Sequence, residues 1–189
     1  MQGVLTKLQK ELGITFVYVT HRQSEAFAKS DRVVIMNQGR IEQIDSAKGI
    51  YRNPATRFVA EFGGANNILT GTVVAADELI EIETPAGLFK CPENSDHTWS
   101  IGDTTSLVIS ADLIRLSTSA VNETNEMACR FISEEFVGSI VTVLAETPDG
   151  ADFRIQLQQR ELSELDLNVG ATIYVRWDSH DAHLLRDTI

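Results

Sequence analysis

Apolar residues at the start of the chain first follow a helical spacing and then form a continuous run. The helical stripe consists of Val4, Leu5, Leu8 and Leu12. It predicts an amphipathic helix that Gly13 ends, and the β-branched and aromatic run Ile14–Val19 predicts a buried parallel strand after it. This order is the second half of a β-α-β unit whose first strand is missing. Residues 1–30 are therefore predicted to be a fragment of a larger α/β domain.

Short elements are predicted between residues 24 and 45. A helix is expected over Ser24–Lys29. The apolar run Val33–Met36 and the segment Arg40–Ile44 predict two strands joined by a hairpin turn that contains Gly39.

Two further helices are expected before residue 63. The first has Ser46 as its N-cap and ends before Asn53, and the second has Pro54 near its first turn. The apolar face of the second helix consists of Phe58, Val59 and Phe62. Gly63–Asn67 is the most linker-like segment of the chain.

Beyond this linker the pattern changes to short alternating runs of apolar and polar residues. Pro and Gly lie between several of these runs, where they supply the backbone angles that tight turns need. The predicted strands are Leu69–Ala75, Leu79–Glu83, Leu88–Cys91, Thr105–Ile109, Ala128–Ile132, Ser139–Glu146, Ala151–Gln158 and Thr172–Trp177. Residues 66–189 are therefore predicted to be all-β.

A repeat with a constant offset of 68 residues lies within this β region. Residues 101–109 match residues 169–177, and Asp112, Ile114 and Leu116 match His180, Ala182 and Leu184. Two copies of one small unit are predicted, at about 68–117 and 127–187. Five or so short strands in each copy are typical of a barrel of the OB type.

Charge is divided unevenly along the chain. The net charge is −11, made up of +3 over residues 1–65 and −14 over residues 66–189. The acidic part would repel a phosphate backbone, so no nucleic-acid partner is expected. No apolar run approaches the ~20 residues that span a bilayer, and no signal peptide is visible, so a cytoplasmic location is expected. Cys91 and Cys129 are widely spaced and are interpreted as packing residues.

Three other groups could carry chemistry, and each has a simpler structural interpretation. His180 and His183 with Asp178 and Asp181 have the ligand types of a metal site, but they align with a solvated turn of the repeat. Glu134 and Glu135 point to opposite faces if they lie on a strand, which argues against a catalytic pair. The aromatic residues Trp99, Trp177 and Phe136 could stack bases, but core packing fits the acidic region better.

Several motifs together resemble the C-terminal third of the ATPase subunit of ATP-binding cassette (ABC) transporters that import sugars, polyamines or ferric iron. They are Thr20-His21-x-Gln23-x-Glu25-Ala26, Ser30-Asp31-Arg32-Val33, Met36-Asn37-x-Gly39-x-Ile41-Glu42-Gln43, Ile50-Tyr51-x-x-Pro54 and Phe58-Val59-Ala60-x-Phe62. In that family a transport-associated OB (TOBE) domain of two OB-like units follows. The resemblance implies an α+β chain: the remnant of a P-loop α/β nucleotide-binding domain at 1–65, then an all-β double OB-like regulatory domain at 66–189.

The resemblance also implies a catalytic role for His21, as the switch histidine that contacts the γ-phosphate of ATP and helps to orient the attacking water. An imidazole both donates and accepts hydrogen bonds, which suits a centre where charge moves during phosphoryl transfer. The alternative is a histidine that only satisfies backbone groups at a strand end. ATP and Mg²⁺ are the cofactors expected for the full-length protein, and no cofactor or metal is expected for this chain alone.

Other parts of the ATPase site do not occur in the sequence. There is no GxxxxGK[ST] phosphate loop, no Leu-Ser-Gly-Gly-Gln signature and no apolar strand ending in Asp-Glu, so the chain is not expected to hydrolyse ATP by itself. Arg22 and Ser24 stand where the family usually has Asp and Glu. The segments Asp45-Ser46-Ala47 and Ser110-Ala111-Asp112 also depart from the family pattern.

The partners that the resemblance implies are a second copy of the ATPase subunit, membrane-spanning permease subunits and, indirectly, a solute-binding protein. The chain would then lie on the inner face of the cell membrane. The chain is expected to be the C-terminal regulatory portion of the ATPase subunit of an importer for a small solute. The residue pattern of Phe62–Gly71 favours a polyamine or iron over a sugar as that solute. The alternative is a free-standing OB-like ligand-binding or regulatory module without an ATPase role.

Overall fold

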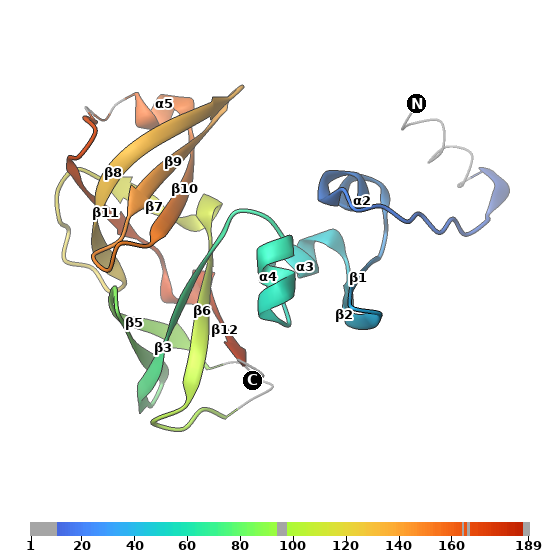
Figure 1. Cartoon of the computed structure of the whole chain (residues 1–189), viewed down its shortest axis with the longest axis horizontal. Coiled ribbons are helices and arrows are strands. Elements are labelled where there is room, and N and C mark those ends of the chain that lie inside the picture. The colour runs from blue at the N-terminus through green and yellow to red at the C-terminus, as the bar shows by residue number, and fades with distance from the viewer. Residues whose placement is uncertain (1–10, 94–97, 164, 166, 187–189) are drawn as a thin grey trace. The chain divides into compact units, whose positions relative to one another are not determined.

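The chain forms two compact units, Met1–Gly64 and Ala65–Ile189. The computed structural model describes residues 11–93, 98–163, 165 and 167–186, which are mostly strand with a few short helices (Figure 1). No helix in these described ranges is long and apolar enough to cross a membrane.

The first unit is built around a β-hairpin. Its elements are α2 (Gln23–Lys29), β1 (Val33–Asn37), β2 (Arg40–Asp45), α3 (Ala47–Arg52) and α4 (Arg57–Phe62). Gln38 and Gly39 connect the strands, and both have the positive φ that a type I′ turn requires. Buried residues from the hairpin and from α3 and α4 form a small core of Val33, Ile35, Ile50 and Val59. The predicted hairpin is therefore confirmed, and one of its faces packs against the helices.

Side-chain caps set where the two helices after the hairpin begin. The Ser46 Oγ accepts a hydrogen bond from the backbone N–H of Gly49, as the sequence predicted. The second helix begins later than expected, because Thr56 caps it by accepting from the N–H of Val59. Pro54 therefore precedes the cap and does not lie in the first turn.

The predicted strand over Ile14–Val19 is wrong, because this segment has no strand structure. Val17 and Val19 are 87% and 91% exposed. A strand needs hydrogen-bonding neighbours, and the described residues of the first unit provide none for this segment. Most of the helix predicted over residues 4–12 lies outside the described residues.

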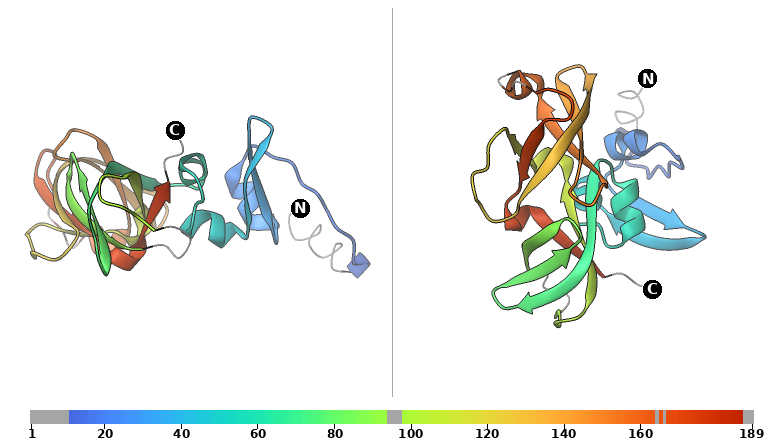
Figure 2. Two further views of the ribbon diagram at one scale, coloured as in Figure 1. Left: turned by 90° about the horizontal axis from the view of Figure 1, so that it is seen from below. Right: turned by 60° about the vertical axis from the view of Figure 1, so that its left-hand side comes forward.

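The second unit contains two five-stranded antiparallel sheets that curl, as Figure 2 shows from two further sides. One has the order β12-β6-β3-β4-β5 and the other the order β10-β9-β8-β11-β7. The strands are β3 (Asn66–Ala76), β4 (Leu79–Thr84), β5 (Gly87–Pro92), β6 (Thr104–Ser110), β7 (Arg115–Ser117), β8 (Glu126–Val137), β9 (Ile140–Glu146), β10 (Asp152–Gln158), β11 (Thr172–Arg176) and β12 (Ala182–Arg186). A short helix, α5 (Gln159–Leu162), follows β10. All eight predicted strands are present, and β7 and β12 are additional.

The two copies of the repeat exchange their last strands. The 3-10 turn η1 (Ala111–Leu113) joins β6 to β7, and η2 (Ser179–Asp181) joins β11 to β12, at the predicted offset of 68. However, β7 pairs with β11 of the second copy, and β12 pairs with β6 of the first copy. Each sheet is therefore completed by a strand from the other copy.

The repeat also extends to the first strands of each copy, at an offset of 58 that the sequence did not reveal. Val73 in β3 and Phe131 in β8 each lie at a register shift. Val73 makes two backbone hydrogen bonds with the turn before β6, to Gly102 and Asp103. Phe131 makes the same two bonds with the turn before β11, to Gly170 and Ala171. The two offsets differ because the connecting segments of the copies differ in length.

Two buried asparagines, 58 residues apart, form reciprocal clamps between the copies. The Asn67 side-chain amide donates to the carbonyl of Arg154 at 2.8 Å and accepts from its N–H at 2.8 Å. The Asn125 amide makes the same two bonds to Lys90, at 2.8 and 2.6 Å. Because β10 and β5 are edge strands, each asparagine supplies the partners that a neighbouring strand would otherwise provide.

A single hydrophobic core serves both sheets. Trp177, which follows β11, packs against Phe89 of β5 and Phe153 of β10, with ring centroids 4.9 and 6.1 Å apart. All three side chains are buried. The second unit is therefore one packed body and not two independent barrels.

Replacing Asn67 is expected to destabilise the second unit. Asn67→Ala leaves the N–H and C=O of Arg154 without their partners, which costs about 1–3 kcal/mol of unfolding free energy. Asn67→Asp should cost at least as much, because a carboxylate then faces the Arg154 carbonyl. Urea denaturation measures the stability of both variants. The control is Gln158→Ala, at an exposed position on β10, the strand that contains Arg154. Equal stabilities of the Asn67 and Gln158 variants would contradict the clamp.

Strand exchange predicts that residues 65–189 unfold in one transition. Leu184→Ala in β12 should lower the unfolding free energy by about 2–5 kcal/mol, because Leu184 is 2% exposed. The loss of stability should affect both sheets, so the backbone amides of β6 and of β11 should lose hydrogen-exchange protection together. Loss of protection in the β6 sheet alone would show that the copies unfold independently.

Candidate functional site

His21 lies in the first unit, immediately before α2. Its side chain is exposed and, within the residues that the structure describes, makes no hydrogen bond or ion pair. It follows Thr20 at the end of the Ile14–Val19 segment. The imidazole is thus available to a ligand rather than committed to backbone groups.

A hydrogen-bond network centred on Glu25 holds the segment that carries His21. The Glu25 carboxylate accepts from the hydroxyls of Tyr18 at 2.8 Å and Thr20 at 3.2 Å. The Thr20 hydroxyl oxygen in turn accepts from the N–H of Arg22 at 3.0 Å. The residues on both sides of His21 are thereby tied to the first turn of α2.

Arg22, one of the two departures from the family motif, is part of this network. Its Nη1 lies 3.1 Å from the Glu25 carboxylate, in an i,i+3 ion pair. The hydrogen bond from Tyr18 is the largest influence that lowers the pKa of Glu25, followed by that from Thr20 and by the charges of Lys29 and Arg22; burial acts in the opposite direction. The extra positive charge is therefore compensated locally.

The described part of the first unit contains the imidazole of His21 but no cluster of metal-ligand side chains. Within the described ranges, no three His, Cys, Asp or Glu side chains lie close enough to hold a metal ion. His21 can donate or accept a hydrogen bond, but the residues that would bind phosphate do not occur in the sequence. The imidazole alone can polarise or orient a group that other residues bind.

The remaining candidates occupy structural positions in the second unit. Asp178 caps η2 by accepting from the N–H of His180 at 2.9 Å, so this aspartate serves the turn. Glu134 and Glu135 are both exposed on β8. Trp99 and Trp177 are buried, as core packing requires, whereas Phe136 is 57% exposed, so the prediction of core packing is wrong for Phe136. Its strand extends beyond the sheet core into the β8–β9 hairpin.

Both cysteines are buried and free. Burial raises the pKa of each thiol to about 12, with a smaller contribution from Asp149 at Cys129. The Cys91 Sγ donates to the carbonyl of Ala182 at 3.2 Å. These thiols fill space between strands and are poor nucleophiles at neutral pH.

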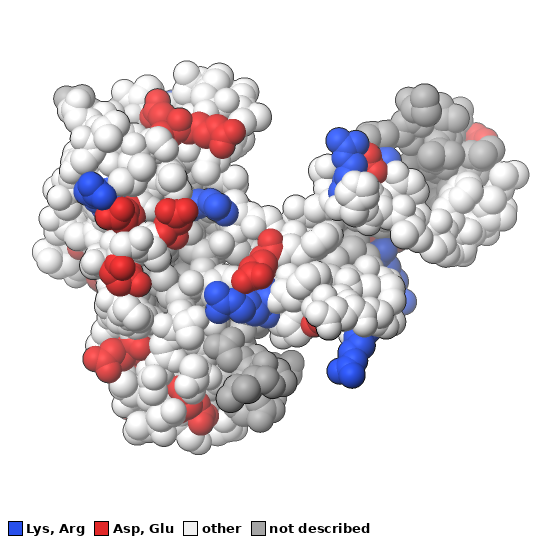
Figure 3. Space-filling view, viewed as in Figure 1, with Lys and Arg blue, Asp and Glu red and all other residues white. Residues whose placement is uncertain are grey.

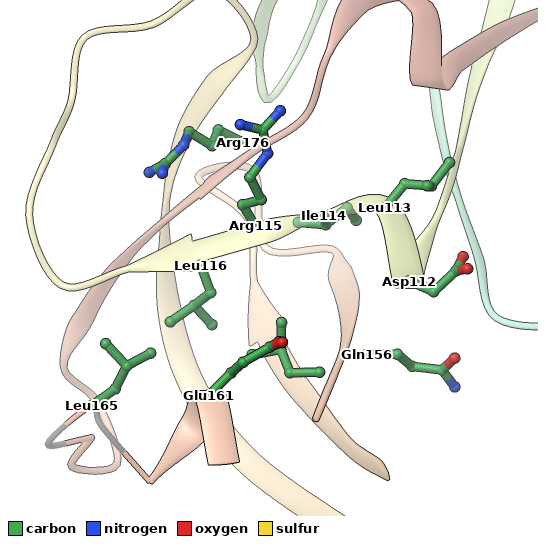
Figure 4. Close-up of a pocket in the computed structure, with 10 residues that line it drawn as sticks. Asp112, Leu113, Ile114, Arg115, Leu116, Gln156, Glu161, Leu165 and Arg176 are labelled. Carbon is green, nitrogen blue, oxygen red and sulfur yellow. The ribbon is translucent and has the colours of Figure 1, made fainter. Parts of the chain in front are cut away.

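A shallow cleft of about 400 Å³ lies beside β7 in the second unit, and sequence analysis did not find it (Figure 4). It is lined by Asp112, Leu113, Ile114, Arg115, Leu116, Gln156, Leu157, Glu161, Leu165 and Arg176. The residues come from η1, β7, β10, β11, α5 and the segment after it. Strand exchange brings them together, so no local motif marks the cleft.

The Glu25 network should respond to pH in a defined direction. Because its folded pKa is lowered, the network adds stability above the ordinary carboxyl pKa and loses it as pH falls through the lowered value. An NMR titration of the Glu25 carboxyl should therefore give a midpoint below 4.5. Tyr18→Phe should raise the midpoint more than Thr20→Val does, and an unchanged midpoint in Tyr18→Phe would contradict the network.

Comparisons with known proteins agree with these features. A model of the TOBE domain matches residues 107–185. The chain is 36% identical over 98% of its length to the spermidine/putrescine import ATP-binding protein PotA of Pseudomonas aeruginosa (strain UCBPP-PA14), and 33% identical to that of Rubrobacter xylanophilus, again over 98%. It spans about half of each relative, 52% and 48%.

A solved structure shares the fold of the β region. The cytoplasmic molybdate-binding protein ModG, with molybdate bound, matches 64% of this chain and 96% of its own, with a TM-score of 0.59 and 18% identity. The motif around His21, the duplicated β unit and the similarity along nearly the whole chain support one assignment. The chain belongs to the family of ABC-type import ATPase subunits and corresponds to their C-terminal region with its TOBE domain.

Proposed function

We propose that this chain is the C-terminal portion of the ATP-hydrolysing subunit of a polyamine importer. The observation that carries the proposal is the similarity along 98% of the chain to spermidine/putrescine import ATP-binding proteins. In this proposal His21, within the motif Thr20-His21-x-Gln23-x-Glu25, is the switch histidine. In this proposal the first unit is the last part of a P-loop nucleotide-binding domain. The second unit is a double OB-like regulatory domain.

Apolar surface on the first unit supports its assignment as part of a larger domain. One face of the β1–β2 hairpin carries two cross-strand pairs of exposed apolar side chains, Val34 with Ile44 and Met36 with Ile41, between 44% and 58% exposed. The Ile14–Val19 segment is exposed as well. Soluble proteins seldom expose such contiguous apolar surface. Both surfaces suit packing against the remaining half of the relatives' length.

In the full-length protein, His21 would contact the γ-phosphate of ATP, and the Glu25 network would hold it in position. ATP and Mg²⁺ would be bound by the phosphate loop and the acidic strand that this sequence lacks. Two copies of the subunit would join permease subunits on the inner face of the membrane. A solute-binding protein would deliver the polyamine from the other side.

The second candidate function is a ligand-binding or regulatory module that acts without the ATPase. The second unit has a complete hydrophobic core of its own. Its fold accounts for 96% of the ModG chain, so that protein consists almost entirely of it. The two candidate functions differ in whether His21 is needed for ATP hydrolysis.

Replacing His21 tests the first candidate. The N-terminal part of the Pseudomonas aeruginosa relative, up to the matched region, is joined to this chain. His21→Ala should then lower kcat for ATP hydrolysis by about 10²–10⁴-fold and leave ATP affinity nearly unchanged, because the histidine acts on the reacting phosphate. Steady-state phosphate release and fluorescent-nucleotide titration measure the two effects. His180→Ala, in the exposed η2 turn, is the matched control, and full hydrolysis by the His21 variant would remove the proposed role.

A further inference from the structure

The β8–β9 hairpin is longer than the equivalent hairpin of the first copy of the repeat. β8 continues for six residues after Phe131, to Val137. The residue of β3 that is equivalent to Phe131 is Val73, and β3 continues for only three residues after it, to Ala76. The added length is therefore a feature of the second copy and is not required by the fold.

The added part of the hairpin exposes apolar side chains on both of its faces. Phe136, Val137 and Ile140 are 57%, 68% and 37% exposed. Successive side chains of a strand point to opposite faces, so Phe136 lies on one face and Val137 on the other. Val137 and Ile140 are register partners, and the tip of the hairpin projects from the second unit (Figure 1). Apolar surface gathered in this way is typical of an interaction site.

One edge of the added part of β8 has no strand beside it. On one side, β9 pairs with β8 as far as Val137. On the other side, β11 pairs only with Glu126–Arg130, and Phe131 binds the turn before β11. Within the described ranges, no strand pairs with this second edge between Ser133 and Val137. Its outward N–H and C=O groups are therefore available to an added strand.

Two carboxylates decide which strand this edge favours. Glu134 and Glu135 are exposed and have no ion pair in the part of the chain that the structure describes. A second copy of the chain would place its own two glutamates along the same short edge, where like charges are destabilising. A basic strand would be attracted, because the second unit has a net charge of −14 and Figure 3 shows acidic side chains spread over the face in view.

A hollow of about 230 Å³ beside this edge has room for a basic side chain. It is lined by Ser133, Glu135, Thr142, Leu144, Asp152 and Arg154. Two carboxylates and one guanidinium group face it, so the lining favours a cation. Glu135 belongs both to the hollow and to the unpaired edge, so a strand added to the edge could place a side chain there.

We propose that the edge of β8 from Ser133 to Val137 binds an extended segment of a partner protein that carries a pair of basic residues next to a pair of apolar residues. The backbone of this segment pairs with the free edge, as in other cases of strand addition. On each face of β8 a glutamate is followed two residues later by an apolar side chain, so the partner segment needs the same spacing. Its basic side chains face the glutamates, and its apolar side chains cover Phe136 and Val137.

Fluorescence polarisation of labelled synthetic peptides with the whole chain tests the site, at about 0.15 M ionic strength to screen unspecific attraction. The peptide Thr-Lys-Lys-Val-Val-Lys-Lys-Thr offers the required pattern in either strand direction and should bind with saturation. A peptide with glutamate in place of lysine, and one with proline in place of both valines, should bind at least tenfold more weakly, because the first is repelled and the second cannot pair as a strand. Absence of saturation, or equal binding of the proline peptide, overturns the proposal.

Glu135→Lys should weaken binding of the lysine–valine peptide at least tenfold, which corresponds to about 1.4 kcal/mol. Phe136→Ser should weaken it as well, because an apolar contact is lost. Glu83→Lys makes the same change of net charge at an exposed position of β4 and should bind like the original chain. All three positions are exposed, so the variants should melt like the original chain. Equal loss in the Glu83 and Glu135 variants, or unchanged binding in Glu135→Lys, overturns the proposal.

Analytical ultracentrifugation distinguishes a partner protein from a second copy of the chain. Because Glu134 and Glu135 oppose pairing between two copies, the original chain and Phe136→Ser should sediment alike. The double variant Glu134→Val and Glu135→Val removes the repulsion and should associate with itself more strongly. Association of the original chain that Phe136→Ser abolishes would make a second copy the occupant of the edge and overturn the proposal.

Discussion

Backbone groups at the edges of a sheet need hydrogen-bond partners, and in residues 65–189 many of these partners come from the other copy of the repeat. The last strands are exchanged, and Asn67 and Asn125 bind the outer edges of β10 and β5. Trp177 joins the two sheets through one core. Neither copy is complete alone, so folding, core packing and the position of the β7 cleft all depend on the exchange.

The first unit, in contrast to the second, leaves apolar surface exposed. Its hairpin buries one face against α3 and α4 and leaves the other apolar face exposed, and the Ile14–Val19 segment has no strand neighbours among residues 11–64. His21 is nevertheless held by local contacts, because Glu25 binds residues on both sides of it. Local contacts alone thus fix the backbone on both sides of His21.

The two copies of the repeat have diverged at particular positions of the shared fold. The equivalent register pairs are Arg115 with Arg176 in one sheet and His183 with Val108 in the other. The hairpins differ as well: Asp77 and Glu78 lie between β3 and β4, whereas the β8–β9 hairpin exposes Phe136 and Val137. Since the shared fold requires neither feature, both distinguish one copy from the other.

Local pattern alone determined the hairpin at Gly39, the Ser46 cap, eight strands and the 68-residue repeat, because turn geometry, capping and alternation depend on neighbouring residues. The His21 motif likewise identified the family. The tertiary structure decided the exchange of β7 and β12, the asparagine clamps and the opposed arginines. These involve residues tens of positions apart, and no local pattern records which strand a given edge accepts. The Ile14–Val19 strand failed for the same reason, because a strand exists only where another strand pairs with it.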